Sequence, residues 1–246
     1  LDRLFRACYP FGYSKAYCLL AIEKADVSTK ENSVKKKHIL CFGDSNTWGY
    51  DAVNGGRYDD DIRWTMPLQG ILGTNYLVVE EGLSGRTTVF DDPLNEGLSG
   101  LSALTSTLMS HCPPDLMVLM LGTNDCKERF SANATNIKDG MLRLVKKARQ
   151  IECWAGAPNI LVVAPIIIDQ RIYTSPLNGP GMGMGCAEKS EKLPGLYAQA
   201  AKDFGFSFMD SNPHVKAADK DFMHFDQDSN ARFAQALAEK IKEILG

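Results

Sequence analysis

The chain has 246 residues, of which 44% are hydrophobic and 23% are charged. This composition is typical of a globular protein, and the length allows a core that needs no disulfide or metal support. The formal net charge of −3 argues against nucleic acid as the main partner. No apolar run reaches the roughly 18 residues that a membrane span needs, so we expect no membrane segment.

Residues 1–37 precede the first regular element of the sequence. The stretch 8–22 is partly apolar, but proline, glycine and lysine interrupt it and no small-residue cleavage site is evident. A secretory signal is therefore not indicated, and we expect a cytoplasmic protein, although the extension leaves export open. The polar stretch 23–37 is typical of a linker. We predict an N-terminal extension or linker over 1–37, as an arm, an anchor or an upstream translated extension, and one domain over 38–246.

The cysteines and histidines give no pattern of a metal or disulfide scaffold. Seven cysteines make an odd number, and no C-x-x-C pair occurs. Cys41 lies in an apolar run, where a small buried thiol is the ordinary explanation. The four histidines form no metal-spaced cluster with cysteine. We therefore expect no metal site, and the chemistry predicted below requires no organic cofactor.

Five short apolar runs follow one another along the chain, at 38–42, 76–82, 115–122, 159–168 and 205–210. Near-continuous runs of this length indicate strands that are buried on both faces, as in a parallel sheet. Two stretches between or after them, 133–150 and 228–245, repeat apolar residues at helical spacing. Strands that alternate with helices imply βαβ crossovers. We predict an α/β protein, a three-layer α/β/α sandwich with a mostly parallel five-stranded sheet.

The segment 169–195 has an unusual composition, with five glycines, three prolines, Met182 and Met184. Such a composition predicts a long loop. We expect this loop to lie over the strand ends and to shape a pocket there. The sequence leaves open whether it acts as a lid or as an oligomer contact.

Small and polar residues stand where the predicted strands end. Ser45 follows the first strand, Gly85 the second and Asn124 the third, while Asp221 and His224 come just before the last helix. Because ligands of open α/β sheets bind outside the carboxyl ends of the strands, we expect these residues to share one site. Each alone has an ordinary explanation as a helix cap, a turn residue or a loop histidine. Their joint occurrence at successive strand ends favours a common function.

These residue types are the ones that acyl transfer requires. Ser45 would be the nucleophile, His224 the base that takes its proton, and Asp221 the acid that orients the imidazole. The backbone N–H groups of Ser45 and Gly85, with the side-chain NH₂ of Asn124, would stabilise the oxyanion.

Four stretches resemble the motif blocks of the SGNH/GDSL hydrolase family. They are CFGDSNTWGY at 41–50, GLSGRT at 82–87, GTND at 122–125 and DFMH at 221–224. The resemblance runs from about His38 to Gly246. It implies the flavodoxin-like fold of that family and the catalytic roles given above.

Longer stretches, DSNTWGY, EGLSGRTTVFDDP and MLGTNDCK, are similar to the bacterial arylesterase/acyltransferase branch of the family. A mycobacterial member has Leu, Trp and Ala where this chain has Asn46, Tyr50 and Gly85, and the first two differences imply a more polar substrate pocket. Trp48 and Tyr50 would line that pocket and Lys127 would lie at its rim; packing of the first helix turn and a solvated lysine are the alternatives. The branch also implies a homo-oligomer and acyl transfer to an alcohol.

The predicted function is that of a serine esterase acting through an acyl-enzyme on short-chain aryl or alkyl esters. Its substrate would be a small-molecule ester, and water or an alcohol would accept the acyl group. A carbohydrate O-deacetylase is the alternative, because the same site removes acetyl groups from sugars. A non-catalytic flavodoxin-like module is a distant alternative, in which GDSNT at 43–47 would hold a flavin phosphate. It leaves Asn124, Asp221 and His224 without roles.

Overall fold

A computed structural model of the chain describes residues 35–177 and 179–246. All of these residues except Lys35 belong to one compact unit that begins at Lys36 and ends at Gly246. The predicted N-terminal extension, 1–37, lies outside the described residues except for its last three positions. No helix in the described part of the chain has the length and apolar character needed to cross a membrane.

The centre of the unit is a five-stranded sheet with the strand order β2-β1-β3-β4-β5. All four pairings between its strands are parallel, so the predicted sheet is confirmed. The strands are β1 (Lys37–Gly43), β2 (Tyr76–Gly82), β3 (Leu116–Met120), β4 (Ile160–Ala164) and β5 (Ser207–Asp210).

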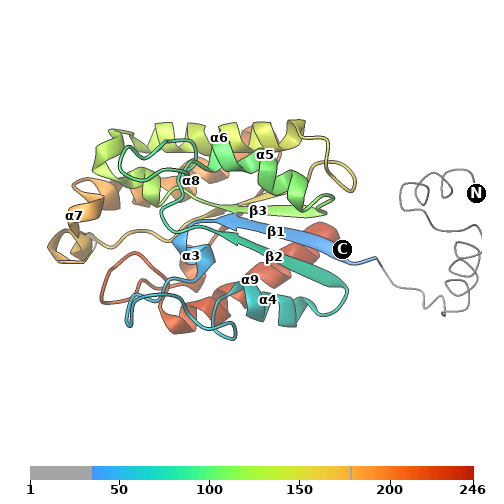
Figure 1. Cartoon of the computed structure of the whole chain (residues 1–246), viewed down its shortest axis with the longest axis horizontal. Helices are drawn as coiled ribbons and strands as arrows, with labels where there is room; N and C mark the ends of the chain where they lie inside the picture. Colours follow the sequence, from blue (N-terminus) through green and yellow to red (C-terminus); the bar gives the residue numbers. More distant parts are fainter. Residues whose placement is uncertain (1–34, 178) are drawn as a thin grey trace, which may run out of the picture. The chain divides into compact units, whose positions relative to one another are not determined.

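Helices cover both faces of this sheet and complete the predicted three layers (Figure 1). One face is covered by α5 (Gly100–Ser110), α6 (Ala134–Gln150) and α8 (Cys186–Phe204), and the other by α4 (Thr65–Leu72) and α9 (Gln227–Leu245). Shorter helices follow the carboxyl ends of the strands. These are α3 (Ser45–Trp48), α7 (Gly179–Met182), and the 3₁₀ turns η2 (Asn124–Cys126), η3 (Glu128–Phe130), η4 (Gln170–Thr174) and η5 (Asn212–His214).

Strand β1 illustrates why the apolar runs are nearly continuous. Successive side chains of a strand point to opposite faces of the sheet. Leu40 and Phe42 therefore pack in the cluster beneath α5, α6 and α8, whereas Ile39 and Cys41 pack in the cluster beneath α4 and α9. Both faces exclude water, so every position of the strand favours an apolar residue. Cys41 is a buried free thiol, as expected.

The strand order creates a crevice between the carboxyl ends of β1 and β3. The chain leaves β1 toward β2 on one side, and it later places β3 on the other side of β1. After β1 the chain continues to α4 on one face, and after β3 it continues to α6 on the opposite face. The connections thus diverge at this point, which is where open α/β sheets bind their ligands.

The prediction of a long loop over 169–195 is wrong in its second half. Only residues up to 185 connect short helical turns, because α8 begins at Cys186. Pro194 lies inside this helix and removes one intrahelical hydrogen bond. Burial of Leu193 and Tyr197 against the core offsets that loss, so tertiary packing outweighs the low helix propensity of the segment.

Candidate active site

Ser45 is presented by the sharp turn that joins β1 to α3. Asp44 caps this short helix, and its Oδ1 accepts the backbone N–H of Asn46 at 3.0 Å. The turn has no room for a larger residue at Gly43, since a Cβ there would lie 2.0 Å from Oγ1 of Thr47. Ser45 is the first helical residue, so its hydroxyl stands at the carboxyl edge of the sheet next to the crevice.

The hydroxyl of Ser45 lies 2.7 Å from Nε2 of His224, although the two residues are 179 positions apart in the sequence. Nδ1 of His224 lies 2.5 Å from Oδ2 of Asp221. The second carboxylate oxygen, Oδ1, accepts the backbone N–H groups of Met223 and His224, both at 3.2 Å. One carboxylate thus bonds to both the imidazole and the backbone of its own loop.

Asp221 is buried, and burial by itself opposes its ionisation. The hydrogen bonds and charge of His224 and the two backbone N–H groups outweigh burial, so the pKa of Asp221 lies below its usual value of 3.8. The carboxylate is therefore charged at neutral pH and can stabilise a protonated imidazole.

Asn46 was expected to line the substrate pocket, but it is buried behind His224. Its Oδ1 accepts the N–H of Phe225 at 2.9 Å, and its Nδ2 donates to the carbonyl of Met223 at 3.4 Å. The amide thus contacts the residues on both sides of His224. The correction has a simple cause: successive residues of a helical turn face different directions, and here Ser45 faces the crevice while Asn46 faces the loop.

Three hydrogen-bond donors surround the hydroxyl end of the site. Asn124, at the start of η2 after β3, donates one N–H of its amide to the carbonyl of Arg86 at 3.1 Å, and this contact orients the group. Within the described residues the backbone N–H groups of Ser45 and Gly85 donate to no protein acceptor. Gly85 has φ +88°, and a Cβ there would lie 2.9 Å from Leu98. Glycine is thus favoured at this position for two reasons: a positive φ is unfavourable for other residues, and a side chain would clash with Leu98.

Asp125, the last residue of the GTND stretch, lies beneath these donors and is fully buried. Its carboxylate accepts the backbone N–H of Thr88 at 3.0 Å and also the hydroxyl of Thr88. Burial raises the pKa of Asp125 to about 6, although the Thr88 bonds oppose the shift. This contact ties the segment after β2 to the segment after β3.

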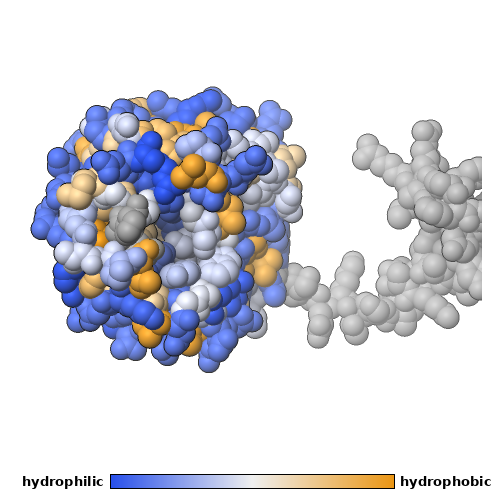
Figure 2. Space-filling view, turned by 60° about the vertical axis from the view of Figure 1, so that its left-hand side comes forward, coloured by the Kyte–Doolittle hydropathy of each residue, from blue (hydrophilic) through white to orange (hydrophobic). Residues whose placement is uncertain are grey.

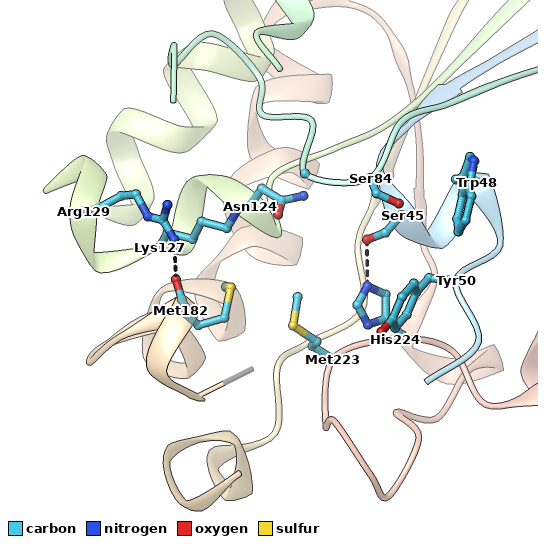
Figure 3. Close-up of a pocket in the computed structure, with 12 residues that line it drawn as sticks. Ser45, Trp48, Tyr50, Ser84, Asn124, Lys127, Arg129, Met182, Met223 and His224 are labelled. Atoms are coloured by element: carbon cyan, nitrogen blue, oxygen red, sulfur yellow. Dashed lines mark hydrogen bonds between the residues drawn. The ribbon is translucent and has the colours of Figure 1, made fainter. Parts of the chain in front are cut away.

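A pocket of about 380 Å³ opens beside Ser45 and His224 at the carboxyl edge of the sheet. Figure 2 turns this edge toward the reader, where hydrophilic and hydrophobic residues alternate around a hollow. Figure 3 labels ten of the side chains that line the pocket. The lining residues are Ser45, Trp48, Tyr50, Ser84, Gly85, Asn124, Lys127, Arg129, Gly181, Met182, Met223 and His224.

The pocket therefore includes three of the four residues proposed for it, namely Trp48, Tyr50 and Lys127. The ring of Tyr50 lies 4.5 Å from the imidazole of His224, between centroids, and limits its movement. Sequence reasoning missed Arg129, which lies on η3 two residues after Lys127 and has no motif of its own. It also missed Met223, although that residue stands inside the DFMH stretch.

The residues that the structure describes include no group of three or more His, Cys, Asp or Glu side chains placed to hold a metal ion. All five described cysteines are free thiols. The groups next to the Ser45 hydroxyl are thus an imidazole, a carboxylate behind it and neutral hydrogen-bond donors, and the two cations of the pocket, Lys127 and Arg129, lie farther along its wall.

The profile of the GDSL-like lipase/acylhydrolase family matches residues 41–236. The chain belongs to this family. The matched region runs from β1 into α9 and contains every residue of the site described above. Membership places the chain among the carboxylic ester hydrolases of the SGNH/GDSL type.

Solved structures of this family share the whole fold. The native aryl esterase of M. smegmatis is 36% identical, with a TM-score of 0.78 over 85% of this chain and 100% of that one. Est24, a carbohydrate acetylesterase from Sinorhizobium meliloti, is 35% identical with the same TM-score of 0.78 and the same coverage. A curated acetylxylan esterase of Xylanibacter ruminicola is 23% identical over 89% of this chain. The chain spans only 45% of the length of that relative.

Proposed function

We propose that this SGNH/GDSL hydrolase cleaves short-chain carboxylic esters through an acyl-enzyme on Ser45. The observation that carries the proposal is the chain of contacts from Ser45 Oγ through His224 to Asp221, with distances of 2.7 Å and 2.5 Å. A serine hydroxyl is a poor nucleophile until a base within hydrogen-bond reach takes its proton.

In the proposed first half-reaction, Oγ of Ser45 attacks the ester carbonyl while Nε2 of His224 accepts the hydroxyl proton. The charged Asp221 fixes the imidazole with its proton on Nδ1 and stabilises the imidazolium that forms. The N–H groups of Ser45, Gly85 and Asn124 stabilise the negative oxygen. His224 then returns the proton to the leaving alkoxide, and the acyl group stays on Ser45.

In the second half-reaction, water attacks the acyl-enzyme with His224 again as the base, and the carboxylic acid is released. An alcohol that occupies the pocket in place of water would receive the acyl group and form a new ester. The pocket of about 380 Å³ favours acyl groups of a few carbons, because its volume is small and the bulky side chains of Trp48, Tyr50, Met182 and Met223 line it.

The test is a series of p-nitrophenyl esters from acetate to dodecanoate, assayed with the wild-type protein and with Ser45→Ala. We expect kcat/KM to be highest for the acetate-to-butanoate esters and Ser45→Ala to be inactive. A fluorophosphonate should add once, and peptide mapping should place it on Ser45. Faster turnover of the dodecanoate, or an adduct on another serine, would contradict the proposal.

Carbohydrate O-deacetylation is a second candidate, supported by the relatives named acetylxylan esterase and carbohydrate acetylesterase. The same acyl-enzyme would form on Ser45, with a sugar as the leaving alcohol. Acetate release from acetylated xylan, compared with release from p-nitrophenyl acetate at equal acetyl concentration, distinguishes the two substrates. Preference for the polysaccharide would favour the second candidate.

We also propose that the chain forms a homo-oligomer. Large apolar side chains are exposed on segments near the carboxyl edge of the sheet: Val53 (54%), Leu94 (73%), Leu177 (55%) and Met184 (64%). Burial of such side chains stabilises association. Light scattering coupled to size exclusion gives the mass, and a monomer at micromolar concentration would contradict the proposal.

A further inference from the structure

The charges on the pocket wall are all of one sign. Among its twelve lining residues, Lys127 and Arg129 are cationic, and no lining residue is a carboxylate. Figure 3 shows both cations on the side of Asn124, across the pocket from Ser45 and Trp48. The wall that faces the nucleophile is therefore positively charged.

A single carboxylate, Asp92, lies near both cations in the described part of the chain. Arg129 NH1 lies 3.4 Å from Asp92 Oδ2, and Lys127 Nζ lies 4.0 Å from the same oxygen. The side chain of Asp92 is fully buried, and its Oδ1 also accepts the backbone N–H of Leu94 at 2.9 Å. Among the described residues, Asp92 is thus the one carboxylate within ion-pair distance of these cations.

The two cations differ in the number of protein groups that bind them. Arg129 uses a second nitrogen to donate to the carbonyl of Gly181 at 2.9 Å, so its guanidinium is held between two partners. The ammonium of Lys127 makes no hydrogen bond to any described residue, and its only ion pair there is the long one to Asp92. Its side chain is nevertheless 13% exposed, so few waters can reach it.

The pKa of Lys127 agrees with this geometry. Burial, and then the neighbouring charge of Arg129, lower it from its usual value, and the charges of Asp92, Asp44 and Asp125 only partly offset them. The charged ammonium is therefore incompletely stabilised by the protein alone. An anion that entered the pocket would remove part of that cost.

We propose that the preferred substrate of this esterase carries a carboxylate, which Lys127 binds while the ester carbonyl lies between Ser45 and Asn124. The inference rests on the proposed esterase function and names its substrate class. Lys127 follows Asn124 by three residues and η2 joins them, so the ammonium and the amide belong to the same wall. The carboxylate must then lie only a few atoms from the ester carbonyl.

Two classes of ester have that form. The carboxylate can belong to the acyl half, as in a half-ester of a short dicarboxylic acid, or to the alcohol half, as in an acetylated hydroxy acid. In either class, cleavage proceeds as in the proposed mechanism: the ester C–O bond breaks, the Ser45 Oγ–C bond forms, and the leaving alkoxide takes the proton from His224. The carboxylate takes no part in bond breaking and serves only to hold the substrate.

The test uses two matched pairs of esters, each followed by acid release at constant pH. Monoethyl succinate is compared with ethyl butanoate for the acyl half, and 3-acetoxypropanoate with propyl acetate for the alcohol half. Each kcat/KM ratio is divided by the ratio of the two alkaline hydrolysis rates, which removes intrinsic reactivity. In one of the two pairs we expect the corrected kcat/KM to be higher for the anionic ester by about 10-fold or more. A factor of this size corresponds to the free energy of a hydrogen bond to a charged group.

Variants at Lys127 separate charge from packing. Lys127→Met should bring the ratio of the favoured pair to near one, and Lys127→Arg should retain most of the preference. Lys240→Met is the matched control, because Lys240 lies on α9 and pairs only with Glu243 among the described residues. It should leave the ratio unchanged, and circular dichroism checks the fold of each variant.

A wild-type ratio of one or less in both pairs would overturn the inference, and so would a preference that Lys127→Met does not reduce. In either case, turnover of the neutral esters that disappears in Ser45→Ala would leave the proposed esterase function standing. If none of the four esters were hydrolysed by a folded protein, the proposed function would fail, and the inference with it.

Discussion

Two substitutions at Asp221 should separate the stability of the catalytic loop from the protonation of His224. Asp221→Asn keeps an oxygen that can accept the backbone N–H groups of Met223 and His224. It places an NH₂ group, however, against Nδ1 of the imidazole. Asp221→Ala removes both kinds of contact at once. The asparagine variant should therefore fold normally and be nearly inactive, whereas the alanine variant should lose activity and stability together.

The size of the stability change follows from the two backbone bonds. A buried donor without an acceptor costs about 1–3 kcal/mol. Both N–H groups lie 3.2 Å from Oδ1, near the long end of the usual hydrogen-bond distances, so we take the lower cost of about 1 kcal/mol for each. The two donors together then lower the free energy of unfolding by about 2 kcal/mol. For a domain of this size, that loss lowers Tm by roughly 4–8 °C.

The size of the rate change follows from the tautomer. With an NH₂ group facing Nδ1, the imidazole must carry its proton on Nε2, where it cannot accept the proton of Ser45. The serine-protease example of this substitution loses about 10⁴-fold in kcat. We expect a similar loss for Asp221→Asn, still smaller than that of His224→Ala, which removes the base itself.

The assay is kcat/KM on p-nitrophenyl acetate together with Tm from circular dichroism. Asp219→Asn is the control, because Asp219 is an exposed carboxylate of the same loop whose ion pair with Arg171 lies at the surface. Its Tm and kcat should stay at wild-type values. An asparagine variant that lost as much Tm as the alanine variant would refute the loop argument. One that kept more than a tenth of wild-type activity would refute the tautomer argument.

Three further substitutions test other parts of the site. Asn124→Ala should lower kcat by roughly 10²–10³-fold with little change in KM, because the lost donor acts mainly in the transition state; a raised KM at constant kcat would assign Asn124 to substrate binding instead. Asn46→Leu removes the acceptor of the Phe225 N–H and should lower kcat roughly tenfold through misplacement of His224, while kcat within twofold of wild type would show that the loop holds itself. The folded state keeps the proton of Asp125 up to about pH 6, whereas the unfolded chain loses it near pH 3.8, so the free energy of unfolding should fall as pH rises between these values. Asp125→Asn should abolish that slope in urea titrations, and an unchanged slope would mean that Asp125 is not its origin.

The sequence by itself determined the layered architecture, because its causes are local. A strand that is buried on both faces must be apolar along its whole length, and such runs could be found without knowledge of their neighbours. The predicted range of β2 agrees with the structure at both ends. The run at 159–168 was extended too far, since β4 ends at Ala164. Pro165 follows, and it has no N–H to continue the ladder.

The motif residues could also be named from the sequence, because a strand end is a fixed point in an α/β fold. Ser45, Gly85 and Asn124 each follow a strand, so their meeting at one edge follows from the parallel order. The contacts of the side chains next to them could not be derived from the strand order. The sequence placed Asn46 in the pocket, whereas the structure directs its amide to Met223 and Phe225.

Only the tertiary structure decided the contacts between segments that are distant along the chain. The pairing of Arg129 with Asp92 joins residues 37 positions apart, and the position of Lys127 in the pocket wall follows from the same packing. Neither the ion pair nor the position of Lys127 could be predicted from periodicity or composition. A local sequence pattern indicates which residues are buried, but it does not indicate which side chains contact one another. These contacts depend on the packing of the whole chain. They place Lys127 and Arg129 in one wall of the pocket, which is therefore positively charged.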